Sequence, residues 1–158
     1  MDATQWTGFV AFGGAAAGCL FLPASSGPAL AAVNGCMAVE CALGLRHGLH
    51  DRVIRLLGDY YPERLPLQIA LVLFAGTAAL ALLAKRWSRP KRGSANIPLI
   101  GTGTALLLFA VETISLHAID RVIYHAAGPV LVIGWLWLAT GSVTLISAAR
   151  ERNRAAPF

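Results

Sequence analysis

The sequence contains few charged residues. Asp, Glu, Lys and Arg make up 13% of its 158 residues, whereas soluble domains carry about 25%. Apolar residues account for 56%, and the mean hydropathy is +0.62, so the chain lacks the side chains that would cover a soluble surface. A small, very apolar soluble helical bundle is the alternative. Because the apolar runs are long and do not alternate with polar residues, we predict an all-α integral membrane protein rather than a barrel.

Other absences exclude further classes of protein. The three cysteines, Cys19, Cys36 and Cys41, show no CxxC spacing, so neither a disulfide framework nor a zinc ribbon is indicated. We expect them to be buried as small hydrophobic residues. No glycine-rich phosphate loop and no serine–histidine–aspartate arrangement is present. The net charge of +5 comes from basic clusters at the ends of apolar runs, a pattern of membrane topology rather than of nucleic-acid binding.

Five apolar runs predict five membrane-spanning helices. The first, at about 6–22, is rather short and lacks the basic flank of a signal peptide. The second starts at Ala29 and keeps a helical pattern to about Leu57, a length of about 45 Å. Its second half should therefore project from the bilayer or lie along its surface. The remaining runs are 65–84, 97–116 with a continuation to about His125, and 130–149, with turns at 23–28, 58–62 and Gly128-Pro129.

The distribution of charge predicts an orientation in the membrane. With five spans, the 85–92 loop and the C-terminal tail lie on the same side, and together they carry eight of the 13 Lys and Arg residues. The positive-inside tendency makes this side cytoplasmic and the N-terminus external. The opposite face collects all four histidines together with Glu40, Asp51, Asp59, Glu63, Glu112 and Asp120, besides Asp2 at the external N-terminus. We expect the inner (plasma) membrane of a bacterium, with the lipid bilayer as the main partner.

An internal duplication relates two parts of the chain. Residues 38–54 read AVECALGLRHGLHDRVI, and residues 110–123 read AVETISLHAIDRVI. Both copies open with Ala-Val-Glu and close with Asp-Arg-Val-Ile, and the interval between Glu and Asp is three residues longer in the first copy. We predict two duplicated hairpins, repeat A at about 29–87 and repeat B at about 97–150, with an extra N-terminal helix. Helices two and four then run in the same direction, so the repeats are parallel.

Acidic and histidine side chains concentrate in the two copies. In the first, Glu40, Gly44, His47 and Asp51 share one face of a continuous helix. In the second, Glu112 and His117 are five residues apart, which puts them on different sides of a regular helix. The candidate metal ligands are Glu40, His47, Asp51, Glu112, His117 and Asp120, with His50 and His125 in reserve. A b-type haem would instead take His47 and His117, with Gly44 and Gly48 leaving room for the ring.

Three functions fit these residues, and the sequence specifies no reaction. The first is a metal or haem site at the outer membrane face, with a redox or metal-handling role. The second is a non-catalytic accessory subunit of a larger membrane complex or homo-oligomer. In it, Arg46, Arg52 and Arg121 would form interfacial ion pairs with the acidic residues. The third is proton or ion transport, with Glu40 and Glu112 as titrating groups. We take the metal or haem site as the working hypothesis because it is the easiest to refute.

Overall fold

The computed structural model describes residues 1–24, 26–44, 96–114 and 117–155, with isolated positions 48, 52, 55, 66, 69, 70 and 77. Of the described residues 83% are helical, so the predicted all-α class is confirmed. The elements are α1 (Ala3–Cys19), α2 (Gly27–Leu43), α5 (Asn96–Ile114), α6 (His117–Ile123), β1 (Ala126–Ala127), β2 (Val130–Leu131) and α7 (Val132–Ala155). The basic cluster at 85–92 lies outside the described residues, and the predicted third span at 65–84 is described only at isolated positions.

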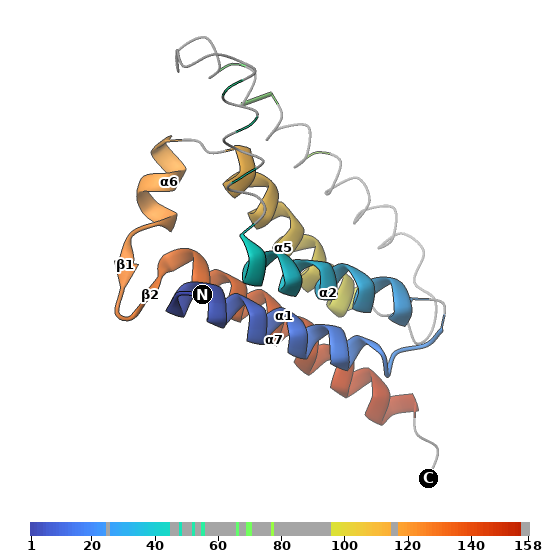
Figure 1. Cartoon of the computed structure of the whole chain (residues 1–158). Helices are drawn as coiled ribbons and strands as arrows, with labels where there is room; N and C mark the ends of the chain where they lie inside the picture. The colour runs from blue at the N-terminus through green and yellow to red at the C-terminus, as the bar shows by residue number, and fades with distance from the viewer. Residues whose placement is uncertain are drawn as a thin grey trace.

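The helices form two sets that run in opposite directions (Figure 1). α1 and α7 run side by side in the same direction, and α2 and α5 both run the other way. At the start of α1, the Thr4 hydroxyl accepts a 3.1 Å hydrogen bond from the Leu131 amide just before α7. Beyond the end of α1, the Arg152 guanidinium of α7 lies 4.4 Å from the centre of the Phe21 ring. The common direction of α2 and α5 is the one that parallel repeats require, while the duplicated hairpins stay a prediction.

Small residues allow α1 and α7 to approach closely along their length. A methyl group added to Gly141 would lie 2.9 Å from the backbone of Ala11, and one added to Gly134 would lie 3.0 Å from Thr4. The contacts recur every seven residues on both helices, at Thr4 with Gly134, Ala11 with Gly141, and Gly18 with Ala148. A seven-residue repeat keeps one seam of each helix facing its neighbour, as in parallel coiled coils. Small residues at such a seam are typical of helix pairs in membranes.

The core lies where the helices meet. Its larger cluster draws on all five helices within the described ranges and consists of Phe12, Met37, Ala38, Cys41, Ala105, Phe109, Ile123, Ile133 and Trp137. The Trp137 ring stacks on Phe109 with centroids 5.6 Å apart and planes at 10°. A second cluster, around Cys19, Leu30 and Ala148, lies nearer the C-terminal end of α7. Two of the three cysteines are therefore buried as predicted, whereas Cys36 is exposed.

The first two helices have clear start signals. Asp2 and Gln5 form a reciprocal capping box at α1, with hydrogen bonds of 2.7 and 2.9 Å, which satisfies amide groups that have no partner within the helix. α2 begins at Gly27, within the segment predicted as a turn at 23–28, and has Pro28 in its first turn, where proline needs no amide hydrogen.

The predicted unbroken helix from Ala29 to about Leu57 is interrupted at Gly44, although the described positions 48, 52 and 55 beyond it are helical. α2 ends at Leu43, because Gly44 adopts a left-handed conformation with φ of 63° and its amide donates to the Glu40 carbonyl at 2.7 Å. Glycine at this position is a common helix terminator because it has no Cβ to clash. Apolar periodicity carries no information on this backbone choice, so the pattern could not show the interruption at Gly44.

Replacing Gly44 tests this helix end. We expect Gly44→Ala to lower the free energy of unfolding by about 1 kcal/mol or more, because a left-handed conformation costs an L-residue with a Cβ about 1–2 kcal/mol. Gly35→Ala, at a site in α2 where an added methyl group meets no atom within 4 Å, should be neutral or stabilising. Chemical denaturation in detergent, followed by circular dichroism, measures both. Equal effects of the two changes would contradict the assigned role of Gly44.

The predicted continuation of the fourth helix to His125 is wrong. The structure has two helices here, α5 and the short α6, and Figure 1 shows α6 displaced from the axis of α5. After α6, two-residue strands pair as an antiparallel hairpin around Gly128, whose φ is 75°. The turn at Gly128-Pro129 was predicted and the strands were not. The Trp135 indole nitrogen donates to the Ala127 carbonyl at 2.9 Å and so ties the hairpin to α7.

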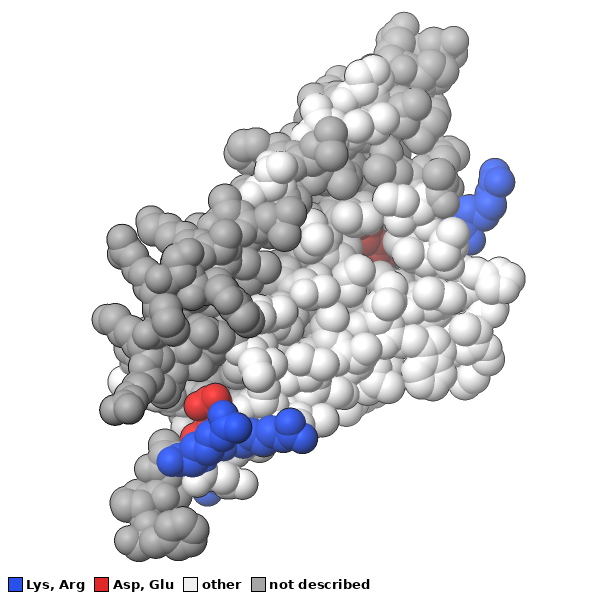
Figure 2. Space-filling view, turned by 180° about the vertical axis from the view of Figure 1, so that it is seen from behind, with Lys and Arg blue, Asp and Glu red and all other residues white. Residues whose placement is uncertain are grey.

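The lengths of the helices and the positions of the charged residues bear on the predicted membrane location. Within the described ranges, α7 is the one helix long and apolar enough to cross a bilayer, with 23 residues at a mean hydropathy of 1.6. α2 and α5 contain shorter apolar stretches. On the face shown in Figure 2, the described Lys and Arg residues lie at opposite ends, and the surface between them is largely uncharged apart from one recessed acidic patch. One end carries Arg150, Arg152 and Arg154 of α7.

Candidate functional site

Glu112 is a buried acidic residue near the end of α5. Its side chain is 4% exposed, and its Oε1 accepts a 3.0 Å hydrogen bond from the Tyr124 hydroxyl. Its second oxygen, Oε2, is also buried. Tyr124 directly follows α6, and its amide donates to the Asp120 carbonyl at 2.9 Å. The chain after α5 therefore folds back so that the segment carrying Tyr124 reaches the Glu112 carboxyl group.

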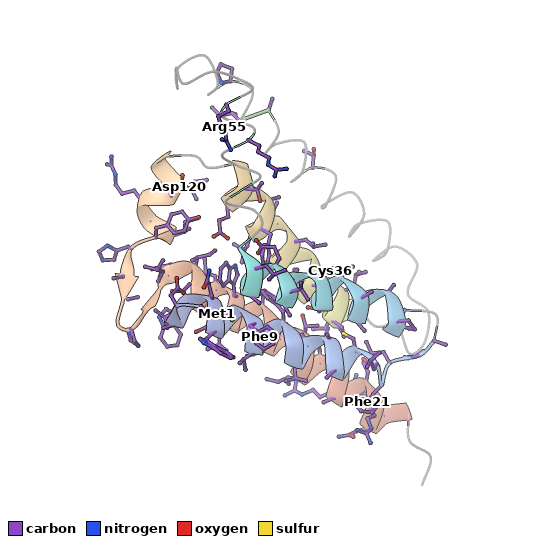
Figure 3. All side chains as sticks on the ribbon, in the orientation of Figure 1. Met1, Phe9, Phe21, Cys36, Arg55 and Asp120 are labelled. Carbon is purple, nitrogen blue, oxygen red and sulfur yellow. The ribbon has the colours of Figure 1, made fainter. Side chains whose placement is uncertain are left out.

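α6 holds this segment in place. Ile123 is buried in the larger core cluster and Ile119 packs against it, so one face of this short helix faces the bundle. Asp120 is half-buried, with its Oδ1 atom fully buried; Figure 3 shows it at the end of the bundle opposite Phe21. His117 is the first residue of α6, and its side chain lies outside what the structure describes.

Glu40 occupies the position in α2 that Glu112 occupies in α5. Glu40 lies three residues before the end of α2, and Glu112 lies two residues before the end of α5. Glu40 is half-buried, and its Oε2 atom is buried. Both glutamates thus lie in the last turn of their helices, while their common depth in a membrane and the duplication stay predictions.

The structure gives less support for the other predicted ligands. His47, His50 and Asp51 lie outside the described residues, and the left-handed Gly44 interrupts the single regular helix on which Glu40, His47 and Asp51 were predicted to share a face. His125 is exposed, and its carbonyl accepts a 3.0 Å hydrogen bond from the Val132 amide at the start of α7. Among the residues that the structure describes, no three His, Cys, Asp or Glu side chains form a group that would hold a metal ion.

Two polar residues that make contacts between segments were not predicted from the sequence. One is Tyr124, which follows the Asp-Arg-Val-Ile motif directly and is 37% exposed. The other is Asn34, which is fully buried and whose Nδ2 donates to the Leu30 carbonyl at 2.8 Å and to the Thr102 hydroxyl at 2.9 Å. This amide joins α2 to α5. A lone asparagine within the apolar run from Ala29 to Leu45 was the available signal, because a polar group there needs a hydrogen-bond partner.

Comparison with known proteins assigns no family. No family model, no curated protein and no solved structure matches the chain. The function can therefore be inferred only from the residues of the site itself.

Proposed function

We propose that the protein is a polytopic membrane protein that binds a metal ion or a b-type haem at the end of the helix bundle where α2 and α5 terminate. The observation that carries the proposal is the buried carboxyl group of Glu112, oriented by the Tyr124 hydroxyl at 3.0 Å. The proposed location is the outer face of a bacterial inner membrane. The basic end of α7, with Arg150, Arg152 and Arg154, then faces the cytoplasm.

A buried acidic group requires compensation. Transfer of a carboxylate to the centre of a membrane costs about 2.5–3.5 kcal/mol on insertion scales, and such groups are usually found with partners that offset their charge. A bound cation would compensate the charge directly. Carboxylates that bind metals are themselves usually held by a further hydrogen bond, which is the role that the Tyr124 hydroxyl would have here.

The surrounding residues suit such a ligand. α6 brings Asp120, with one buried oxygen, and His117 into the segment that folds back toward Glu112. Carboxylate oxygens and imidazole nitrogens together suit zinc, iron, manganese and copper. Glu40 is the matching acidic residue of the first copy, and His47 and Asp51 are the further ligands that the sequence proposes. In the haem form of the proposal, His47 and His117 would hold the haem iron.

Substitution of Glu112 tests the proposal. We expect Glu112→Gln, combined with Glu40→Gln, to abolish the bound metal or haem, because both variants keep the side-chain shape and remove the negative charge. Tyr124→Phe should weaken metal binding by about 10–100-fold, as the loss of supporting hydrogen bonds generally does. The test measures metal content by elemental mass spectrometry and haem content by visible absorption. Both are expressed per mole of purified protein.

Glu151→Gln provides the matched control. Glu151 lies at the basic end of α7 and pairs with Arg154 at 3.5 Å, so this variant should keep the full ligand content. A wild-type protein without bound metal or haem, together with a Glu40/Glu112 double variant at least as stable as wild type, would support the accessory-subunit alternative instead. Its residues would then serve interfacial ion pairs and contacts with partner subunits, and removing two desolvated carboxylates would stabilise the isolated chain.

A further inference from the structure

A groove lies between α1 and α7 at the end of the bundle away from Glu112. It has a volume of about 410 Å³ and is lined by Gly14, Ala17, Gly18, Phe21, Leu145, Ala149, Arg152 and Asn153. Its size falls in the range of about 300–1,000 Å³ that is typical of small-molecule sites. Small residues of α1 form one wall, and the apolar side chains of Leu145 and Phe21 are 39% and 58% exposed. The lining is thus apolar along its length and polar only at Arg152 and Asn153.

Arg152 is held at the polar end of this groove. Its guanidinium carbon lies 4.4 Å from the centre of the Phe21 ring, a cation–π contact that fixes the position of the charge. The guanidinium group carries five N–H donors in one plane, and a cation–π contact attracts its charge without requiring these donors. They can therefore serve an acceptor with several oxygens.

We propose that this groove binds one acyl chain of an anionic phospholipid whose phosphate is held by Arg152. The match is one of charge and shape together: an apolar channel ends at a planar donor group that suits phosphate. Residues 150–154 contain three arginines and one glutamate, a net charge of +2 (3 − 1), which favours an anionic over a zwitterionic headgroup. The inference depends on the proposed membrane location and is independent of the proposed metal or haem.

A neighbouring groove offers an internal comparison. It lies on the other side of α7, between α5 and α7, and has a volume of about 210 Å³ with Arg154 and Glu151 in its lining. There the arginine is paired with the glutamate at 3.5 Å. Arg152 and Arg154 are two residues apart on one helix, so both lie at a similar distance from the membrane surface. They differ in their contacts, because Arg152 lies over the Phe21 ring and Arg154 pairs with Glu151. Arg154 is therefore the matched control for Arg152.

Titration of the full-length protein in detergent with phosphatidylglycerol or phosphatidylcholine, read by native mass spectrometry, tests the proposal. For the first phosphatidylglycerol bound, we expect Arg152→Gln to weaken affinity about fivefold, since one basic residue near a lipid surface contributes about that factor. Phosphatidylcholine binding should stay unchanged in this variant. Arg154→Gln should leave both affinities near wild type. Ala17→Phe, which fills the groove at an exposed position of α1, should weaken both lipids.

Three results would overturn the proposal. Equal losses from Arg152→Gln and Arg154→Gln would mean that the charge acts diffusely. Unchanged lipid affinity in Ala17→Phe would place the acyl chain elsewhere. A shift from dimer to monomer in Ala17→Phe, without a change in lipid binding, would make the groove a contact between two copies of the chain. Failure of the wild-type protein to sediment with membranes after an alkaline wash would instead contradict the proposed membrane location itself.

Discussion

The Trp137→Ala variant is expected to lose about 3–5 kcal/mol of unfolding free energy, the range for removing a large aromatic side chain from a core. Trp137 is 1% exposed and stacks on Phe109 at 5.6 Å. Its ring also lies close to Gly8 of α1, where an added methyl group would be 2.7 Å away. The side chain therefore holds α1, α5 and α7 together, and its removal should leave a cavity that these helices cannot close. Denaturation in detergent, followed by circular dichroism, is the measurement.

Trp135→Ala supplies the control on the same helix. Trp135 is 45% exposed, and its indole nitrogen bonds the Ala127 carbonyl at 2.9 Å. Its loss should cost about 0.5–1.5 kcal/mol, the usual contribution of one hydrogen bond. A larger loss from Trp135→Ala than from Trp137→Ala would contradict the position of the core.

The second large effect is expected from Gly141→Leu. Any Cβ at this position would meet the backbone of Ala11 at 2.9 Å, and backbone cannot move aside as a flexible side chain can. The variant must separate α1 from α7 at the middle of their seam. Overpacking of this kind typically costs about 1–3 kcal/mol and occasionally more, and we expect the upper end because the obstacle is backbone. The same denaturation measurement applies.

Gly13→Leu is the matched control for this prediction. Gly13 belongs to α1 but lies off the seam, and a Cβ added there meets no atom within 4 Å. Its replacement should be tolerated, since leucine favours helix by up to about 1 kcal/mol over glycine. If Gly13→Leu destabilises as much as Gly141→Leu, the seven-residue seam of α1 and α7 is wrong.

Several helices could be located from the sequence alone. The runs at 6–22, 97–116 and 130–149 correspond to α1 (Ala3–Cys19), α5 (Asn96–Ile114) and α7 (Val132–Ala155), because a long apolar run is a strong signal. The ends of α2 and α5 could not be placed in this way. They depend on the left-handed backbone of Gly44 and on the separation of α6 from α5, which reflect local backbone conformation and tertiary contacts rather than periodicity.

The candidate site was located only in part. The repeated Ala-Val-Glu motif within apolar runs pointed to Glu40 and Glu112, and the structure buries Glu112 almost completely. The partner of Glu112, Tyr124, lies 12 residues away and becomes its neighbour only because the chain folds back after α5. A reading that assumes one continuous helix would place Tyr124 more than three turns from Glu112, at about 18 Å along the axis. Contacts made by such a reversal cannot be read from helical spacing.

The central claim is a bound metal or haem at the end of the bundle that contains Glu112. The most direct test is a metal assay together with a visible absorption spectrum of the detergent-purified protein. The account predicts either a Soret band, which would identify haem, or a stoichiometric metal without that band, which would identify a carboxylate and histidine site. Protein that contains neither, even after reconstitution with metal ions and with haem, would contradict the claim.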